Sequence, residues 1–253
     1  MKSKFLVVLL ISAFVLSSCG SLPQVSLGSG GGNIEEEMEL QEIKAEPTEA
    51  VLPENGAYFR DEFENDINDD WGLKVISGLE SQLIWGQNNG KLRLQTLPPN
   101  DTNFLFLNTK QRYDDVIVTA QVSDSGPLDV TTSLICRANQ SGWYEFRISP
   151  SGYYELLRFD QYKRDDGKNA YTNFVEKRVG STKIVSGLNT NQFSLSCVGD
   201  TISAFINGEQ LYWQKRPLAI EDNTYSEGTV GFGMAGYGKE YDLTFDWIEV
   251  SKP

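Results

Sequence analysis

Residues 143–159 read WYEFRISPSGYYELLRF, and this stretch decides the fold. Apolar and polar side chains alternate in two runs that a Pro-Ser-Gly turn joins, a pattern typical of two β-strands in a hairpin. In the first run, the face that we expect to point inward carries Tyr144, Phe146 and Ile148. The opposite face carries Trp143, Glu145 and Arg147.

The turn predicts the register of this hairpin. If residues 150–152 pair Ser149 with Tyr153, then Glu155 lies directly opposite Arg147 on the neighbouring strand. Arg147 and Glu155 would then form an ion pair or line a common site.

The same kind of pattern continues from residue 57 to residue 253. Gly, Pro, Asn and Asp clusters separate short apolar runs at intervals of eight to twelve residues. The predicted strands are 57–63, 82–85, 91–96, 104–107, 116–122, 131–137, 143–149, 153–159, 192–198, 201–206, 229–234 and 241–250. No segment has helical periodicity, so the expected fold class is all-β, a large antiparallel sandwich.

Composition excludes several kinds of chemistry. The chain has 253 residues, a net charge of −13 and no histidine, and only three cysteines. The absence of histidine removes Ser-His-Asp and Cys-His nucleophile systems and His-ligated metal sites. The acidic balance argues against a nucleic-acid partner. Any metal would be a hard cation on oxygen ligands, most plausibly calcium.

The first eighteen residues form a predicted signal peptide. Lys2 and Lys4 precede an apolar run that is too short to cross a bilayer comfortably. The run ends in Leu-Ser-Ser-Cys, which resembles the lipobox of bacterial lipoproteins. This resemblance implies cleavage before Cys19 and attachment of lipid to its sulfur, and therefore an extracytoplasmic protein anchored to a bacterial membrane, at the cell surface or the outer membrane. The alternative is an ordinary secretory signal.

Residues 19–56 differ in composition from the rest of the mature chain. The Gly-Ser-rich segment 28–32 precedes eight glutamates and one lysine, and apolar residues are few. We expect a flexible linker that holds one domain, residues 57–253, away from the membrane. That domain has 19 basic and 27 acidic residues, a net charge of −8.

Two cysteines remain for the domain if Cys19 carries lipid. Cys136 and Cys197 both lie late in predicted strands. An oxidising compartment favours a disulfide between them. The alternative is a pair of reduced core cysteines.

The strand sequences resemble those of the concanavalin A-like lectin/glucanase superfamily, and more narrowly its laminin-G-like and 3-keto-disaccharide hydrolase-like domains. The resemblance is carried by FRDEF at 59–63, LICR at 134–137, GWYEFRISPSGYY at 142–154, NQFSLSCVGD at 191–200, 202–208, GTVGFG at 228–233 and FDWIEV at 245–250. It implies a jelly roll of two curved antiparallel sheets, whose concave face often holds sugar.

The resemblance does not settle catalysis. Related family-16 glycosidases carry E-x-D-x-x-E or E-x-D-x-E on one strand, and this sequence lacks both forms. The nearest string runs from Glu64 to Asp69, with Asp in place of the last Glu. No catalytic residues are therefore assigned, although Glu145 and Glu155 form a carboxylate pair that could act as acid and base.

The expected ligand contacts are Arg137, Trp143, Glu145 and Arg147. Tryptophan offers a flat apolar surface to a sugar ring, and the charged groups beside it can bind hydroxyls. The alternative is an Arg147–Glu155 pair on a solvated face, with Trp143 packed against a loop.

A structural calcium site is the one cofactor considered. Asp61 and Asp246 match positions where related jelly rolls place calcium. Oxygen ligands from the Asn/Asp-rich loop 66–70 are an alternative, and so are acidic residues that only cap turns.

These observations lead to three hypotheses. The first is a membrane-anchored lipoprotein whose domain binds glycan or envelope polysaccharide without catalysis. The second is a structural or protein-interaction module of the cell envelope with a protein partner. The third is a carboxylate-dependent glycan hydrolase.

Overall fold

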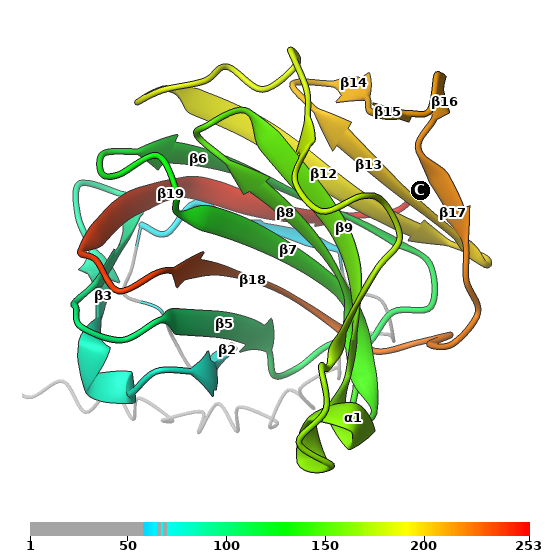
Figure 1. The fold of residues 1–253 in the computed structure, drawn as a ribbon, viewed down its shortest axis with the longest axis horizontal. Helices are drawn as coiled ribbons and strands as arrows, with labels where there is room; N and C mark the ends of the chain where they lie inside the picture. The colour runs from blue at the N-terminus through cyan, green and yellow to red at the C-terminus, as the bar shows by residue number, and fades with distance from the viewer. Residues whose placement is uncertain (1–57, 65–66, 68–69) are drawn as a thin grey trace, which may run out of the picture. The chain divides into compact units, whose positions relative to one another are not determined.

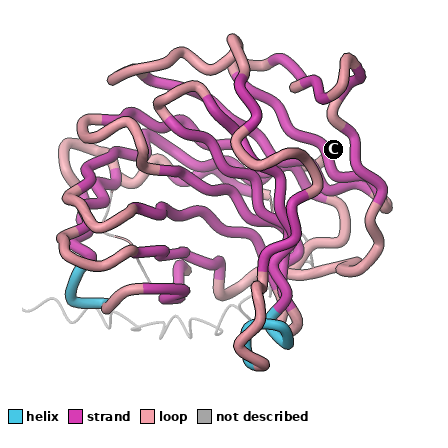
Figure 2. Tube along the Cα trace, in the orientation of Figure 1, coloured by secondary structure: helices cyan, strands magenta, loops and turns pink. Residues whose placement is uncertain are grey.

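The computed structural model describes residues 58–64, 67 and 70–253, and these residues form two antiparallel β-sheets packed face to face (Figures 1 and 2). The predicted signal peptide, Cys19 and the linker lie outside the described residues. Within the part that is described, no helix has the length and apolar composition needed to cross a bilayer.

The nine-stranded sheet has the order β14-β13-β12-β6-β19-β4-β3, with β1 beside β19 and β17 beside β13. Its strands are β1 (Phe59–Asp61), β3 (Leu83–Gln87), β4 (Leu92–Thr96), β6 (Val116–Asp124), β12 (Thr190–Val198), β13 (Thr201–Ile206), β14 (Glu209–Gln210), β17 (Ala219–Glu221) and β19 (Tyr241–Ser251).

The eight-stranded sheet has the order β10-β9-β8-β7-β18-β5-β2, with β11 beside β9. Its strands are β2 (Trp71–Ser77), β5 (Thr102–Asn108), β7 (Thr131–Ala138), β8 (Gly142–Ser149), β9 (Tyr153–Asp160), β10 (Tyr171–Asn173), β11 (Val179–Gly180) and β18 (Thr229–Gly236). A small pair, β15 (Tyr212–Trp213) and β16 (Arg216–Pro217), stands apart.

The main hydrophobic core lies between the two sheets, as the alternation predicted. Tyr144, Phe146 and Ile148 all belong to it, with exposures of 3% or less. From the other sheet, β6 contributes every second residue from Val116 to Val122. Burying so many apolar side chains on the facing sides of two sheets is the main source of stability of a sandwich.

All twelve predicted strands are present; β13 has the predicted bounds, and each of the others has at least one shifted end. The hairpin register is also confirmed, because β8 and β9 pair Ser149 with Tyr153 and Arg147 with Glu155. The cysteines Cys136 on β7 and Cys197 on β12 are joined by a disulfide, which connects one sheet to the other.

Some elements were missed. No segment of the domain has helical periodicity, but α1 (Gln161–Asp165) follows β9, and Asp160 caps it by accepting a hydrogen bond from the Lys163 N–H (3.1 Å). A helix of five residues is too short to show a period. The strand β2 and the short strands β10, β11 and β14–β17 lack a clear alternation, so their pairing depends on neighbouring strands.

Candidate functional site

The site is built on the face of the eight-stranded sheet that points away from the core, which we call the outer face. It carries Trp143, Glu145 and Arg147 of β8, as alternation predicts. Along β8 the surroundings of this face change from an apolar cluster, through a buried ion pair, to an open pocket.

Trp143 lies in the apolar cluster and does not have the role expected of it. Its ring stacks on Phe159 of β9 with ring centres 3.8 Å apart and planes at 11°, and Lys74 of β2 lies over it. With 1% of its surface exposed, Trp143 has no face free for a sugar ring. The expectation of a sugar platform is corrected to a packing role.

Glu145 forms the centre of the buried ion pair. Its carboxylate accepts hydrogen bonds from Ser133 Oγ (2.7 Å), Trp143 Nε1 (3.0 Å) and Arg147 Nε (2.5 Å), and the residue is fully buried. Burial alone would raise the pKa of Glu145, but the charge of Arg147 and these three donors outweigh it and lower the pKa. Glu145 therefore stays ionised and is a poor proton donor.

Arg147 has one side in the ion pair and one side at the pocket. Its guanidinium stacks over the ring of Tyr171 at 4.5 Å. The residue is 8% exposed, and its Nη2 atom is buried without a hydrogen-bond partner. Buried guanidinium N–H groups normally donate to an acceptor, so Nη2 can donate a hydrogen bond to a group in the adjoining space.

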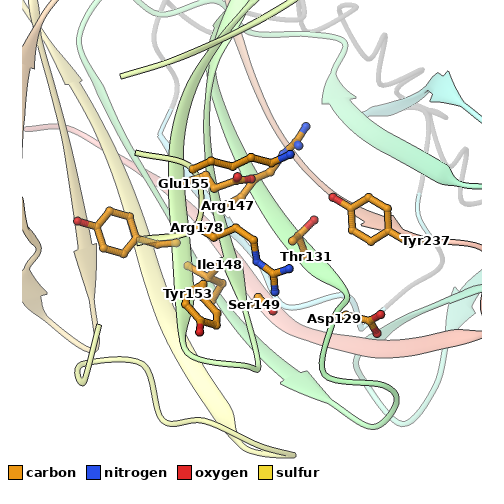
Figure 3. A pocket seen from close by; sticks show the side chains of 11 residues that line it. Asp129, Thr131, Arg147, Ile148, Ser149, Tyr153, Glu155, Arg178 and Tyr237 are labelled. Atoms are coloured by element: carbon orange, nitrogen blue, oxygen red, sulfur yellow. The ribbon is translucent and has the colours of Figure 1, made fainter. Parts of the chain in front are cut away.

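A pocket of about 360 Å³, which we call the outer pocket, opens beyond Arg147 (Figure 3). This volume is within the ~300–1,000 Å³ typical of small-molecule sites. Its lining is Asp129, Thr131, Arg147, Ile148, Ser149, Tyr153, Tyr154, Glu155, Lys177, Arg178 and Tyr237.

Two aromatic side chains flank the outer pocket. Tyr153, which is 40% exposed, and Tyr237, which is 50% exposed, lie on different sides of Arg178 in Figure 3. The guanidinium of Arg178 also lies 5.1 Å from the centre of the Tyr153 ring. Exposed tyrosines with hydroxyl and charged groups between them are suited to a ligand with both apolar and polar faces.

Arg137 does not join this site. It has a φ of 53°, and β18 shifts register between Thr229 and Gly231 beside it, so the alternation breaks at this residue. Its guanidinium donates to the carbonyl oxygens of Asp114 (2.8 Å), Gly199 (2.7 Å) and Tyr225 (3.2 Å). The prediction that it contacts a ligand is corrected to a role in holding loops together.

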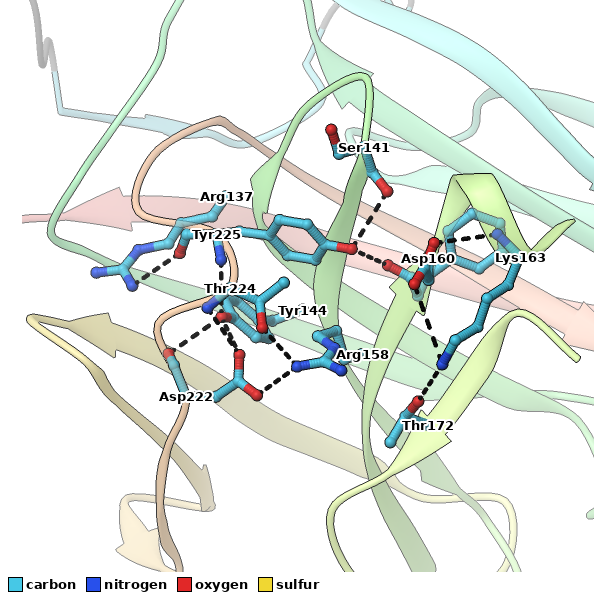
Figure 4. A network of polar contacts seen from close by, with 11 residues as sticks. Arg137, Ser141, Tyr144, Arg158, Asp160, Lys163, Thr172, Asp222, Thr224 and Tyr225 are labelled. Atoms are coloured by element: carbon cyan, nitrogen blue, oxygen red, sulfur yellow. Dashed lines mark hydrogen bonds and ion pairs between the residues drawn. The ribbon is translucent and has the colours of Figure 1, made fainter. Parts of the chain in front are cut away.

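A polar network around Tyr144 adjoins Arg137, which donates to the carbonyl oxygen of Tyr225 (Figure 4). Tyr144 Oη donates to Asp222 Oδ1 (2.6 Å) and accepts from the Tyr225 N–H (3.1 Å). Arg158 donates to the other oxygen of Asp222 (2.6 Å). Because these bonds link β8 and β9 to residues 222–225, the network fixes the segment after β17.

The two carboxylates expected to bind calcium have protein partners. Asp61 accepts from the Phe63 N–H and from Trp71 Nε1, both at 2.9 Å. Asp246 accepts from Lys91 Nζ (2.7 Å) and Gln121 Nε2 (2.5 Å). Among the described residues, no group of three or more His, Cys, Asp or Glu side chains is placed to hold a metal ion.

Similar structures were found, although no protein-family model and no curated protein matches the sequence. The chain is similar to a lichenase from a mouse hindgut metagenome (10% identity, TM-score 0.53, 78% of this chain and 100% of that chain). It is also similar to a Bacillus licheniformis β-glucanase (12%, 0.52, 78% and 99%). A third is a glycoside hydrolase family 16 endo-glucanase from Bacteroides ovatus (10%, 0.53, 76% and 99%).

The domain has the concanavalin A-like jelly-roll fold. The two antiparallel sheets and their match to almost the full length of these enzymes establish this architecture, which the strand motifs implied. At such low identity the similarity concerns the fold alone.

Most of the outer pocket could not be found from the sequence. Four of its residues come from loops without a motif: Asp129, Lys177, Arg178 and Tyr237. Strands β7 to β10 separate Asp129 from Lys177 along the chain. The hairpin register predicted two neighbouring pairs of the pocket lining, Arg147 with Glu155 and Ser149 with Tyr153.

Proposed function

We propose that this protein is a lipid-anchored, extracytoplasmic protein that binds glycan or envelope polysaccharide without catalysis, and that the outer pocket is its binding site. The observation that carries the proposal is the unpartnered Arg147 Nη2 in a pocket flanked by two exposed tyrosines. Sugars present C–H faces that pack on aromatic rings and hydroxyls that accept from guanidinium groups.

The fold supports this proposal as an analogy. The similar structures include enzymes that their names identify as glucanases, so this sandwich accommodates polysaccharides in other proteins. Ser149 and Thr131 add hydroxyl groups to the pocket, which are suited to hydrogen bonds with a sugar.

Two observations support binding without hydrolysis. The sequence lacks the family-16 catalytic pattern. Glu145, which would be one member of a Glu145–Glu155 acid/base pair, is held ionised by three donors and is fully buried. A glycosidase needs one carboxyl group that is protonated near the working pH and can reach the glycosidic oxygen.

The anchor in this proposal is lipid on the sulfur of Cys19. It is supported by the basic start, the short apolar run and the Leu-Ser-Ser-Cys sequence. More than one acyl chain is needed for stable attachment to a bilayer, which lipidated N-terminal cysteines supply.

The test is direct binding of the purified protein to a panel of oligosaccharides, with variants Tyr153→Ala and Tyr237→Ala. Each variant should weaken binding about fivefold or more, the loss of ~1 kcal/mol expected for an aromatic contact residue. The matched control is Tyr212→Ala, because Tyr212 is 56% exposed and lies outside the pocket.

No binding to any member of the panel would contradict the proposal. Release of reducing ends from a bound oligosaccharide would contradict its non-catalytic part.

A further inference from the structure

The unpartnered donor of Arg147 indicates which kind of sugar the outer pocket would bind. Arg147 uses Nε to pair with Glu145 and leaves the buried Nη2 without an acceptor. Because Glu145 already receives three hydrogen bonds and is fully buried, the acceptor for Nη2 has to come from the pocket side.

Two further cations at the pocket are also uncommitted. In the described part of the chain, Lys177 and Arg178 form no ion pair, and the guanidinium of Arg178 lies over the Tyr153 ring. Both residues are exposed, so their charges are available to a ligand.

The acidic residues of the pocket balance these cations only in part. Asp129 is already paired with Lys239, which donates at 2.8 Å. Glu155 remains as the one pocket carboxylate without an ion pair among the described residues. The charge of Arg147 is balanced by Glu145, so Lys177 and Arg178 face a single uncommitted carboxylate, and the pocket keeps one positive charge for an anion.

A guanidinium group favours a planar anion. Two of its N–H groups can donate in parallel to the two oxygens of a carboxylate, and such charge-assisted hydrogen bonds are short and strong. The domain as a whole carries a charge of −8, which repels a polymer with a charge on every residue. The charge of the ligand should therefore be isolated.

We propose that the outer pocket recognises an acidic sugar, whose carboxylate is bound by Arg147 and Arg178, at the end of an otherwise neutral glycan. This inference rests on the proposed glycan-binding function and names the class of glycan.

The test compares matched ligands on the intact protein. Oligosaccharides that end in glucuronic, galacturonic or sialic acid are measured beside the same compounds after chemical reduction of the carboxyl group to an alcohol. At least one acidic member should bind on the order of 10- to 100-fold more tightly than its reduced counterpart, as expected for a charged hydrogen-bonded pair.

The variant Arg178→Gln separates charge from shape. It should reduce this preference about tenfold, because the acidic ligand loses a charged hydrogen-bond partner for its carboxylate. The matched control Arg216→Gln removes a charge from β16, outside the pocket, and should leave the preference intact. Arg178 is exposed, so neither variant is expected to disturb folding.

Each outcome is informative. Equal binding of acidic and reduced ligands would overturn this inference and leave the proposed function standing. Binding of neither form in any pair, together with no binding to a neutral panel, would overturn both. Tighter binding of the sulfated than of the carboxylated form of one oligosaccharide would overturn the assignment to a carboxylate.

Discussion

The ion pair between Arg147 and Glu145 connects the stability of the domain to its site. Glu145 is fully buried. Its charge is tolerated there because Arg147, Trp143 and Ser133 all donate hydrogen bonds to it. Removing one partner of a buried pair leaves an uncompensated charge, which costs far more than the loss of a surface pair. Arg147 is thus required for folding, and its other side faces the outer pocket.

Arg147→Met should lower the free energy of unfolding by about 3–5 kcal/mol, since Glu145 would lose its cation. The double variant with Glu145→Gln should recover part of that loss. Urea unfolding measures both. The control is Arg112→Met, because the Arg112–Glu227 pair is exposed and should contribute no more than about 1 kcal/mol. Equal losses of stability for the two arginine variants would contradict a larger contribution from the buried Arg147–Glu145 pair than from the exposed pair.

Asp124 introduces a pH dependence. It is buried at the end of β6 with an unpartnered Oδ1, and burial raises the pKa of its carboxyl to about 7 from an ordinary value of 3.8. Because the folded pKa is raised, the protonated form stabilises the domain below pH 4, and this contribution is lost as the pH rises to about 7.

Asp124→Asn should therefore stabilise the domain relative to the wild type increasingly between pH 4 and pH 7, by up to about 4 kcal/mol. Urea unfolding at a series of pH values measures this difference. Asp129→Asn should show the opposite trend, because Lys239 lowers the pKa of Asp129 and the carboxylate stabilises the fold at higher pH. A difference for Asp124→Asn that does not change with pH would contradict the assignment.

At the scale of elements, the two sheets are joined by their shared core and by one covalent link. The disulfide between Cys136 and Cys197 connects β7 of the eight-stranded sheet with β12 of the nine-stranded sheet. The residues that it joins are 61 positions apart, so it restricts a long loop of the unfolded chain.

The variant Cys136→Ala with Cys197→Ala should lower the free energy of unfolding by about 4 kcal/mol, the loop-closure value for a separation of 61 residues. Reducing agent should destabilise the wild type by a similar amount and leave this variant unchanged. Two free thiols in the wild type purified without reductant would instead indicate reduced core cysteines.

The hairpin of β8 and β9 is the element that positions the pocket. Its register places Arg147 beside Glu155, and its turn brings Tyr153 to the pocket edge. The neighbouring strand β7 adds Ser133 to the ion pair and Thr131 to the pocket. Because these strands belong to a continuous sheet, the site is held by backbone hydrogen bonds rather than by a loop alone.

For the whole molecule, the proposed arrangement is a lipid anchor at Cys19, a linker of low apolar content and one sandwich domain. A negatively charged linker and a domain of charge −8 are repelled by an anionic membrane surface, so the linker should keep the domain away from it.

Cys19→Ser should release the protein from the membrane fraction into the soluble extracytoplasmic fraction, because serine cannot form the thioether. Cell fractionation and the mass of the N-terminal peptide measure this. Ser18→Ala keeps a small residue before the cysteine and should leave the protein in the membrane fraction. Membrane association of both variants would exclude Cys19 as the anchor.

Strand positions and side-chain faces could be predicted from the sequence because the period-two alternation is a local property of an extended backbone. The hairpin register was predictable for the same reason, since a short turn determines which residues pair. Arg137 is the exception, because its positive φ and the adjacent shift in register break the alternation where no sequence signal marks it.

By itself, the sequence determined the all-β sandwich, the inward and outward faces of β8 and the Arg147–Glu155 register. Only the tertiary structure decided that Trp143 is covered, that Glu145 is the partner of Arg147, and that residues from four distant segments form the outer pocket. The physical reason is that the stereochemistry of the extended backbone alone determines which side chains of a strand share a face. Exposure and pairing depend on which distant parts of the chain pack over that face.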